Sequence, residues 1–458
     1  MRPLPPHPLK RRIARGLAFV AAAAAMGLGL GPASAAPLPD SPVLDRDFAD
    51  PDVVKVGGTY HAYATNGDGK HIQHATSRDL KRWKADSRDV LPVLGGWAAP
   101  RRDLVWAPEV FATGDGFAMH YTAHDRASDR QCIGVALSSS PDGPFRPVGD
   151  GPLVCPAAEG GAIDASSYTE GGQRYLLWKN DGNCCGTDTW LHLQPVTWDG
   201  TRTTGDPVRL IRLIRQDPTG EDGVVEAPTL VKRAGQYVLF YSAGDYRGDH
   251  YRTGYAVART LTGPYTKAAK PLMTTETLSG AVHGPGGQDV VTGPDGRDRI
   301  VFHGWLADPR RRVMYTAGLG FANGYPVVRG SKVLYQAENA LVHHAAVRDA
   351  PSASDGRAVG GIGHADSHVE FTVFTAAAGE HRLSVWFGNG SQDGAGSPVE
   401  ATHGLTVNGR TAGTVRYRHT GWDRWSVVDT ALALKEGWNT IRLSKGEYYA
   451  ELDGVEVA

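Results

Sequence analysis

The stretch Gly57-Gly58-Thr59-Tyr60-His61-Ala62-Tyr63 joins a glycine turn to a run in which aromatic and aliphatic side chains alternate. Alternation with a period of two predicts a β-strand, and the glycines before it favour a tight turn. The pattern returns at intervals of roughly 60 residues, within the range of a propeller blade with long loops. The later copies occupy 114–121, 172–178, 235–241 and 296–303, and each is followed by a second strand-like run. The five copies predict five four-stranded sheets around an axis, a five-bladed β-propeller over residues 36–332. An ordinary sandwich with coincidental turns is the alternative.

A different pattern begins after residue 332. The repeat stops near Arg329-Gly330-Ser331-Lys332, and new alternating runs occur at 369–373, 382–387, 405–407 and 440–443. A segment of about 125 residues with several short strands is typical of a jelly-roll β-sandwich. The sequence therefore predicts an all-β protein, in which the propeller is followed by a β-sandwich over residues 333–458.

The overall composition restricts the partners of the protein. Of 458 residues, 41% are apolar, which is enough for packed cores and argues against disorder. Lys and Arg number 48 against 49 Asp and Glu, so the net charge is −1. This balance argues against nucleic acid as a partner.

The first 35 residues have the pattern of a signal peptide. A basic segment at 10–15 precedes an Ala-rich apolar run at 17–30, and Ala33-Ser34-Ala35 offers a cleavage site. A membrane anchor is the alternative, but the run is shorter than the about 20 residues of a comfortable span. We therefore expect a secreted, extracellular protein with no membrane association after signal cleavage.

Four cysteines occur, at Cys132, Cys155, Cys184 and Cys185. In an oxidising compartment they predict one or two structural disulfides. Three pairings are open, and Cys184 with Cys185 forms either a vicinal bridge or two separate bridges. A zinc site is the alternative, but the spacing of cysteines in zinc sites is missing.

Three acidic residues precede repeat copies in equivalent positions. Asp50, Asp164 and Glu226 are flanked by Ala, Ile and Val, and the symmetry of a propeller would bring them together around one axis. Poor solvation raises the pKa of a carboxyl group. Hydrolysis of a glycosidic bond needs one protonated and one ionised carboxyl group, so these residues are candidates for that chemistry.

The ordered set of motifs around these acids resembles glycoside hydrolase family 43. The matching motifs are Ala49-Asp50-Pro51, Trp106-Ala107-Pro108-Glu109, Ala162-Ile163-Asp164 and Val225-Glu226-Ala227-Pro228, within residues 41–332. Members of the family are five-bladed propellers with three catalytic acids. The resemblance implies that Asp50 is the general base, Glu226 the general acid, and Asp164 the residue that tunes and orients the acid. It also implies inversion, with the base and acid carboxyl groups about 6.5–9.5 Å apart. Asp47 and Asp52 are nearby rivals for the role of base.

Two further residues are candidates for substrate binding. The flat ring of Trp106 suits the C–H face of a sugar, and His303 ends the fifth repeat, where it could donate to a sugar hydroxyl; core packing is the alternative for both. Many family members carry a metal-holding His after a Gly-Pro-Gly motif. Here Gly284-Pro285-Gly286 is followed by Gly287, so we expect no metal or other cofactor in catalysis.

The C-terminal segment resembles carbohydrate-binding modules of families 35 and 6. The resemblance rests on Tyr335-Gln336-Ala337-Glu338-Asn339-Ala340 at its start and Glu451-Leu452-Asp453-Gly454-Val455 at its end. It implies that Gln336, Glu338 and Asp453 hold a structural calcium ion, which prefers oxygen ligands. It also implies that Asn389 and Trp422 bind sugar in loops.

These observations predict a secreted, monomeric glycosidase that acts on arabinose-containing plant cell-wall polysaccharide, most simply an exo-acting α-L-arabinofuranosidase. A β-xylosidase or an endo-arabinanase of the same mechanism is the alternative within the family. A lectin-like propeller that binds glycan without cleaving it is the alternative from another class.

Overall fold

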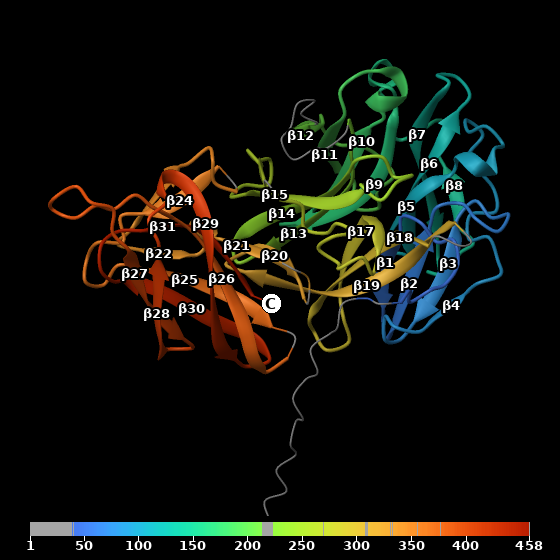
Figure 1. The fold of residues 1–458 in the computed structure, drawn as a ribbon. Helices are drawn as coiled ribbons and strands as arrows, with labels where there is room; N and C mark the ends of the chain where they lie inside the picture. The colour runs from blue at the N-terminus through green and yellow to red at the C-terminus, as the bar shows by residue number, and fades with distance from the viewer. Residues whose placement is uncertain are drawn as a thin grey trace, which may run out of the picture. The chain divides into compact units, whose positions relative to one another are not determined.

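The computed structural model describes residues 39, 41–212, 223–268, 270–306, 310–329, 331, 333–354, 356–375 and 377–457 (Figure 1). The expected signal peptide lies outside these residues. Within them, the regular elements are strands and four single-turn 3-10 helices, so the predicted all-β class is confirmed. No helix in this part of the chain has the length and apolar character needed to cross a bilayer.

The first five sheets each contain four antiparallel strands. The first is β1 (Asp52–Val56), β2 (Thr59–Ala64), β3 (Gln73–Ser77) and β4 (Trp83–Ala85). The second is β5 (Trp106–Ala112), β6 (Phe117–Asp125), β7 (Arg130–Ser138) and β8 (Arg146–Val148). The third is β9 (Ala162–Glu170), β10 (Gln173–Asn180), β11 (Trp190–Val196) and β12 (Val208–Arg212). The fourth is β13 (Val225–Arg233), β14 (Gln236–Ala243), β15 (Arg252–Ala258) and β16 (Thr266–Lys267). The fifth is β17 (His283–Thr292), β18 (Asp298–Leu306), β19 (Arg311–Ala322) and β20 (Tyr325–Val328).

The first strands of these sheets form a closed ring. Strand β1 contacts β5, β5 contacts β9, β9 contacts β13, β13 contacts β17, and β17 contacts β1 again. The segment before β1 adds a second closure, because the backbone N–H of Val43 donates to the carbonyl oxygen of Met314 in β19 (2.9 Å). Five antiparallel sheets around one axis are the arrangement of a five-bladed propeller.

The repeated sequence pattern corresponds to one structural unit in every sheet. Its glycine turn connects the first and second strands, and its alternating run forms the second strand, namely β2, β6, β10, β14 or β18. Aromatic and aliphatic side chains of these strands fill the spaces between neighbouring sheets. For example, Tyr63 of the first sheet packs in one buried cluster with Met119 and Tyr121 of the second.

The remaining strands form a six-stranded and a five-stranded sheet. The larger contains β21 (Leu334–Gln336), β23 (Ala346–Asp349), β24 (Arg357–Gly360), β26 (Gly379–Asn389), β29 (Gly421–Leu434) and β31 (Glu451–Val457). The smaller contains β22 (Leu341–His343), β25 (His368–Thr375), β27 (Ala401–Val407), β28 (Arg410–Tyr417) and β30 (Gly437–Lys445). Both sheets contribute to a single hydrophobic core, in which Val385 and Leu452 of one sheet pack with Phe371 and Ile441 of the other.

The 3-10 helices lie in connections: η1 (Arg102–Leu104), η2 (Ala157–Glu159), η3 (Gly182–Cys185) and η4 (Ala337–Asn339). Two disulfides, Cys132–Cys155 and Cys184–Cys185, account for all four cysteines. The pairing that the sequence left open is therefore the one with a vicinal bridge, which lies in η3.

Candidate active site

Each inner strand contains, or begins two residues after, a residue whose backbone lies in the left-handed region. The five residues are Asp50 (φ 52°), Ala107 (φ 40°), Asp164 (φ 58°), Ala227 (φ 49°) and Gly287 (φ 57°). Strand pairing shifts register in the neighbourhood of the last four, between Trp106 and Glu109 for instance. Bulges of this kind turn side chains to a new direction, and they are frequent next to active sites. The fivefold repetition shows that the pattern belongs to the scaffold, on which the acids are placed.

These five positions surround one pocket on the axis of the ring. The pocket is lined by three consecutive residues from each sheet: 50–52, 107–109, 164–166, 227–229 and 287–289. Asp50 and Asp164 therefore share the pocket, and Glu226 directly precedes its lining residue Ala227. The sequence prediction that these three acids gather at the axis agrees with this arrangement.

Asp50 is surrounded by groups that favour its ionised form. Its carboxylate accepts a hydrogen bond from the Thr65 hydroxyl (2.5 Å), and its Oδ1 lies 3.6 Å from the Arg312 guanidinium and 3.3 Å from His303 Nδ1. Burial alone would raise the pKa of Asp50, but the charge of Arg312 and the contact with His303 lower it well below its usual value. An ionised carboxylate at the axis is what a general base requires.

His303 does not line the pocket as a sugar ligand, and that prediction is wrong. The ring is fully buried in β18, behind Asp50, whose backbone N–H points to His303 Nδ1 (3.1 Å). Its ring stacks on Tyr251 with 5.7 Å between centroids. Its ring has no solvent exposure, and its contact is with the carboxylate of Asp50.

The same packing explains why no histidine follows the Gly284-Pro285-Gly286 motif. A Cβ atom on Gly287 would lie 2.5 Å from His303 Nδ1 and 2.8 Å from Asp50 Oδ1. The backbone of Gly287 also has a positive φ of 57°. The space that a side chain at this position would need is already filled by His303.

Glu226 is held by two buried partners. Its Oε2 lies 3.0 Å from the ammonium group of Lys179, and its Oε1 accepts a hydrogen bond from the Tyr251 hydroxyl (2.8 Å). Lys179 has no exposed side-chain surface, and its Nζ also lies 3.5 Å from Asp181. Burial would lower the pKa of Lys179, but the charges of Glu226 and Asp181 raise it, so the lysine remains charged.

Asp164 has an environment opposite to that of Asp50. Burial and the neighbouring charge of Glu226 raise its pKa to about 8, against the lowering effect of Lys179. Its Oδ2 accepts a hydrogen bond from the backbone N–H of Ala227 (2.9 Å), which fixes it beside the Glu226 segment. The axis therefore holds one carboxyl group that is ionised and one that is protonated near neutral pH.

Tyr251 connects the three acids electrostatically. Burial raises its pKa well above the usual value, and the charges of Glu226, Asp50 and Asp164 add to this effect. Because all three carboxyl groups affect the pKa of one buried phenol, they lie in one cluster around Tyr251. Tyr251 lies in the loop before β15, and nothing in its sequence context marked it as functional.

Sequence reasoning also missed Thr65, Lys179 and Arg312. Thr65 follows β2, and its hydroxyl both donates to Asp50 and accepts the N–H of Ala107 (3.0 Å). Lys179 offered a signal, because it directly follows the apolar run 175–178 at a place where a lysine needs a buried partner. Arg312 follows the fifth repeat copy, and no sequence motif around it indicated a functional role.

A second set of acids lies further along the inner strands, and it links the sheets. The backbone N–H groups of Val110, Ser167 and Val53 donate to Asp52, Glu109 and Asp289 respectively, each at 2.9 Å. Burial raises the pKa of Glu109 to about 7 and of Asp289 to about 6, and it raises that of Asp52 well above its usual value. Asp52 is thus a buried group that accepts a hydrogen bond from Val110, and Asp47 is exposed, which leaves Asp50 as the candidate base.

Trp106 occupies the ring position that Glu226 occupies in the fourth sheet, one residue before the pocket lining. The side chain is partly buried, and its indole N–H donates to the carbonyl oxygen of Asp103 (3.0 Å). This placement keeps Trp106 as a candidate sugar platform.

The two candidate sugar ligands near the C-terminus differ in exposure. Asn389 is fully buried at the end of β26, where its amide donates to the carbonyl oxygens of Val399 and Tyr417 and accepts from Ser391. Its prediction as a loop residue that binds sugar is wrong, because its hydrogen bonds are used within the protein. Trp422 is 47% exposed and remains a candidate.

Two of the predicted calcium ligands, Gln336 and Asp453, place side-chain oxygen atoms around the hydroxyl group of Ser354. The Ser354 hydroxyl lies 2.9 Å from Gln336 Oε1 and 2.8 Å from Asp453 Oδ1. One hydroxyl has one proton, so it satisfies only one of these two oxygens. Glu338 follows Gln336 in η4, and its carboxylate is buried. This set of oxygen atoms fits the preference of calcium.

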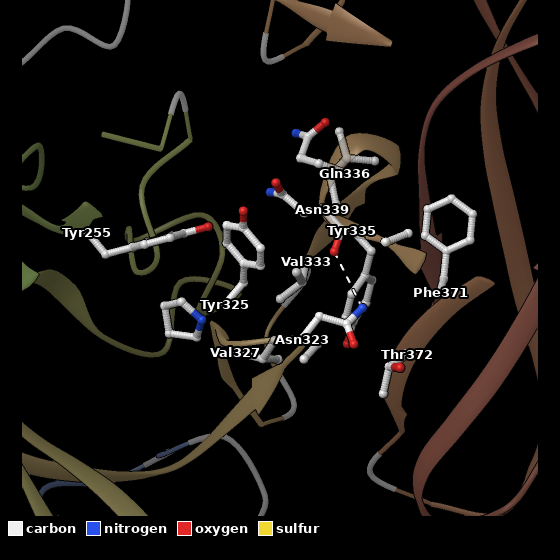
Figure 2. Close-up of a pocket in the computed structure, with 14 residues that line it drawn as sticks. Tyr255, Asn323, Tyr325, Val327, Val333, Tyr335, Gln336, Asn339, Phe371 and Thr372 are labelled. Carbon is white, nitrogen blue, oxygen red and sulfur yellow. Dashed lines mark hydrogen bonds between the residues drawn. The ribbon is translucent and has the colours of Figure 1, made fainter. Parts of the chain in front are cut away.

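Another pocket has no catalytic character. Figure 2 shows its lining, which includes Tyr255, Tyr325, Tyr335 and Phe371. Among its lining residues there is no carboxyl group and no histidine. The axial pocket, whose lining includes Asp50, Glu109 and Asp164, remains the candidate active site.

Comparison with known proteins agrees with this geometry. Residues 39–317 match the family described as "Glycosyl hydrolases family 43". A relative from Streptomyces chartreusis, named "Extracellular exo-alpha-(1->5)-L-arabinofuranosidase", is 30% identical over 66% of this chain and 92% of its own length. A relative from Thermotoga petrophila, named "Extracellular endo-alpha-(1->5)-L-arabinanase", is 28% identical over 47% of this chain, and the match spans only 50% of that relative.

A solved structure shares the fold of the same region. The crystal structure of "a thermostable family-43 glycoside hydrolase" superposes with a TM-score of 0.55 at 28% identity, over 62% of this chain and 93% of that one. The resemblance inferred from the four motifs is confirmed for this region. The chain belongs to family 43 of the glycosyl hydrolases and is a glycoside hydrolase.

Proposed function

We propose that the protein is an inverting glycosidase that releases arabinose from α-1,5-linked arabinan, with Asp50 as base and Glu226 as acid. The observation that carries this proposal is the axial pocket, in which acids from three sheets meet in environments that separate their protonation states. A site that only binds glycan has no need of buried carboxyl groups with opposite pKa shifts.

Each residue has one task in the proposed reaction. Asp50, kept ionised by Arg312 and oriented by Thr65, takes a proton from a water molecule that attacks the anomeric carbon. Glu226, held by Lys179 and Tyr251, protonates the departing oxygen. Asp164 has a pKa of about 8, and the backbone N–H of Ala227 fixes it beside the Glu226 segment, where it orients the acid. Inversion follows from direct attack by water.

The choice of sugar and linkage is supported by the relatives. Both the Streptomyces and the Thermotoga protein are named for α-1,5-linked arabinose polymers, one as an exo-acting and one as an endo-acting enzyme. The exo-acting relative aligns over the larger share of this chain, 66% against 47%. We therefore propose exo action, with Trp106 as a platform for the sugar.

The test compares wild type with Glu226→Gln and Asp50→Asn on linear arabinan and on an aryl arabinofuranoside. We expect wild type to release arabinose as the first product, and Asp50→Asn to lose about 10²–10⁴-fold in kcat on both substrates. Glu226→Gln should lose most on arabinan, because an activated aryl leaving group needs less protonation. Early release of oligosaccharides would indicate endo action. Undiminished activity in either variant would refute its assigned role.

We further propose that residues 333–458 form a β-sandwich domain that binds carbohydrate through the exposed ring of Trp422. The supporting observation is the hydrophobic core shared by its two sheets. Gln336, Glu338 and Asp453 would hold a structural calcium ion there. Residues 36–332 would form the catalytic domain.

We also infer that the chain is exported and loses residues 1–35. Support comes from the signal-like sequence, and from relatives that are named extracellular. A polysaccharide outside the cell is then the partner, and a monomer suffices for the proposed reaction.

A further inference from the structure

A pair of buried histidines in the first sheet faces a carboxylate from the second sheet. His61 of β2 and His74 of β3 are 5% and 2% exposed, and their rings stack with centroids 5.4 Å apart. Asp142 lies in the connection between β7 and β8. None of these residues lines the axial pocket, so the catalytic reaction does not account for them.

The three ligand atoms form a triangle of the size that a tetrahedral metal ion requires. His61 Nδ1 lies 3.1 Å from His74 Nε2 and 3.5 Å from Asp142 Oδ1, and His74 Nε2 lies 3.9 Å from the same oxygen. Ligands at about 2.0–2.2 Å from zinc in a tetrahedron are about 3.3 Å apart, close to the mean of these three edges.

The orientation of His74 fits a metal ligand. Its other ring nitrogen, Nδ1, lies 3.4 Å from Asp86 Oδ2. Histidines that bind metals commonly donate their second N–H to a carboxylate, which leaves the first nitrogen free to bind the ion. Asp86 is itself fixed by Arg88, whose guanidinium donates to the same oxygen (2.6 Å).

The third ligand is held in place by contacts between the two sheets. The Tyr63 hydroxyl donates to the carbonyl oxygen of Pro141 (2.5 Å), and the backbone N–H of Phe145 donates to that of Val90 (2.7 Å). These bonds fix both sides of Asp142. Its carboxylate is 47% exposed, so an ion can enter and keep a water molecule as fourth ligand.

We propose that His61, His74 and Asp142 bind a zinc ion that links the first two sheets of the propeller, with Asp86 as the hydrogen-bond partner that orients His74. Two ring nitrogens 3.1 Å apart are joined either by an N–H···N hydrogen bond or by a cation that both of them bind. In the proposal this cation is Zn²⁺, and the hydrogen bond is the competing outcome. The ion adds a bond between sheets at a place away from the catalytic acids.

The test is zinc binding to the full chain after removal of metals with a chelator. Titration with zinc chloride is followed by calorimetry, and metal content by elemental analysis. We expect wild type to bind one equivalent of zinc tightly. His61→Phe and Asp142→Asn should each lose more than tenfold in zinc affinity. Asp86→Asn should lose about 10–100-fold. Asp142→Asn keeps the size of an exposed side chain, so it tests the ligand without disturbing the core.

A second histidine cluster supplies the control. His343 and His344 both contact Asp366 Oδ2, at 3.3 and 2.8 Å, on an exposed surface. A variant with His343→Ala and His344→Ala should keep the tight equivalent. If this variant loses it, or if Asp142→Asn binds zinc like wild type, the proposal is overturned. Absence of tight binding in wild type overturns it as well, and then a proton joins the two rings.

Discussion

At the scale of single residues, the backbone at Asp50 and Asp164 restricts which side chains are possible. Their φ angles of 52° and 58° lie in a region that aspartate and asparagine enter more readily than other residues with a Cβ atom. Such a conformation costs about 1–3 kcal/mol and persists only where the surroundings enforce it. Asparagine is therefore the appropriate replacement in mechanistic variants, since it keeps both the shape and the tolerance for this backbone.

Arg312 controls the acidic side of the pH profile. Its charge is the main influence that lowers the pKa of Asp50, against the effect of burial. In Arg312→Gln the pKa of Asp50 should rise, because the ionised form loses its stabilising charge. The base is then protonated at a higher pH, so the acid limb of kcat/KM moves upward. Measurement of kcat/KM from pH 3 to 9 tests this, with Arg299→Gln as a control from the same sheet. An unmoved acid limb would contradict the prediction.

Lys179 is expected to set the position of the alkaline limb of the kcat/KM profile. Asp164 has a pKa of about 8, and the charge of Lys179 holds it below the value that burial and Glu226 would produce. In Lys179→Met the pKa of Asp164 should rise further, so Asp164 loses its proton at a higher pH and the alkaline limb of kcat/KM moves to higher pH. The same pH series measures it. If the alkaline limb moves to lower pH, or if only the acid limb moves, Lys179 does not lower the pKa of Asp164.

At the scale of elements, the glycine turn and alternating strand were predictable because each repeat carries its own local signal. The three candidate acids were predictable as a group because each precedes a repeat copy, but Glu226 stands one position before the place that Asp50 and Asp164 share. His303 and Asn389 were misassigned for a common reason. His303 lies within β18 and Asn389 at the end of β26, and a sequence does not reveal whether a polar side chain in a strand faces a pocket or a buried partner. Thr65 and Arg312 act on an acid of a distant segment, so no local pattern could identify them, and the lysine beside an apolar run at Lys179 did not reveal which acid it contacts.

Gly287 illustrates the demands that an inner strand makes. Gly287→Ala should destabilise the fold by roughly 1–3 kcal/mol and reduce kcat, because the new Cβ collides with His303 and Asp50 at a positive φ. Gly296→Ala is the matched control, since its φ is 73° but a Cβ atom there would have no neighbour within 4 Å. Thermal unfolding and kcat are measured for both. Equal effects of the two variants would mean that backbone conformation alone explains the loss.

At the scale of the whole molecule, calcium should stabilise the C-terminal sheets. Ligands that bind only the folded state raise the midpoint of thermal unfolding. We expect a higher Tm with calcium than with a chelator in wild type and no such difference in Asp453→Ala. Glu447→Ala, which removes an exposed carboxylate from a neighbouring loop, should respond like wild type. A calcium response that survives in Asp453→Ala would exclude the proposed ligand set.

The contacts of Asp50 also impose an order on the appearance of activity during synthesis. Its partner His303 follows 253 positions later in the chain, and Arg312 comes later still. With Asp50 as the proposed base, a nascent polypeptide that already carries all three acids lacks the groups that keep this carboxylate ionised until the final sheet is made and packs against the first. We therefore expect glycosidase activity to appear only when the last sheet is complete. Fragments truncated before Arg312 should show no hydrolysis.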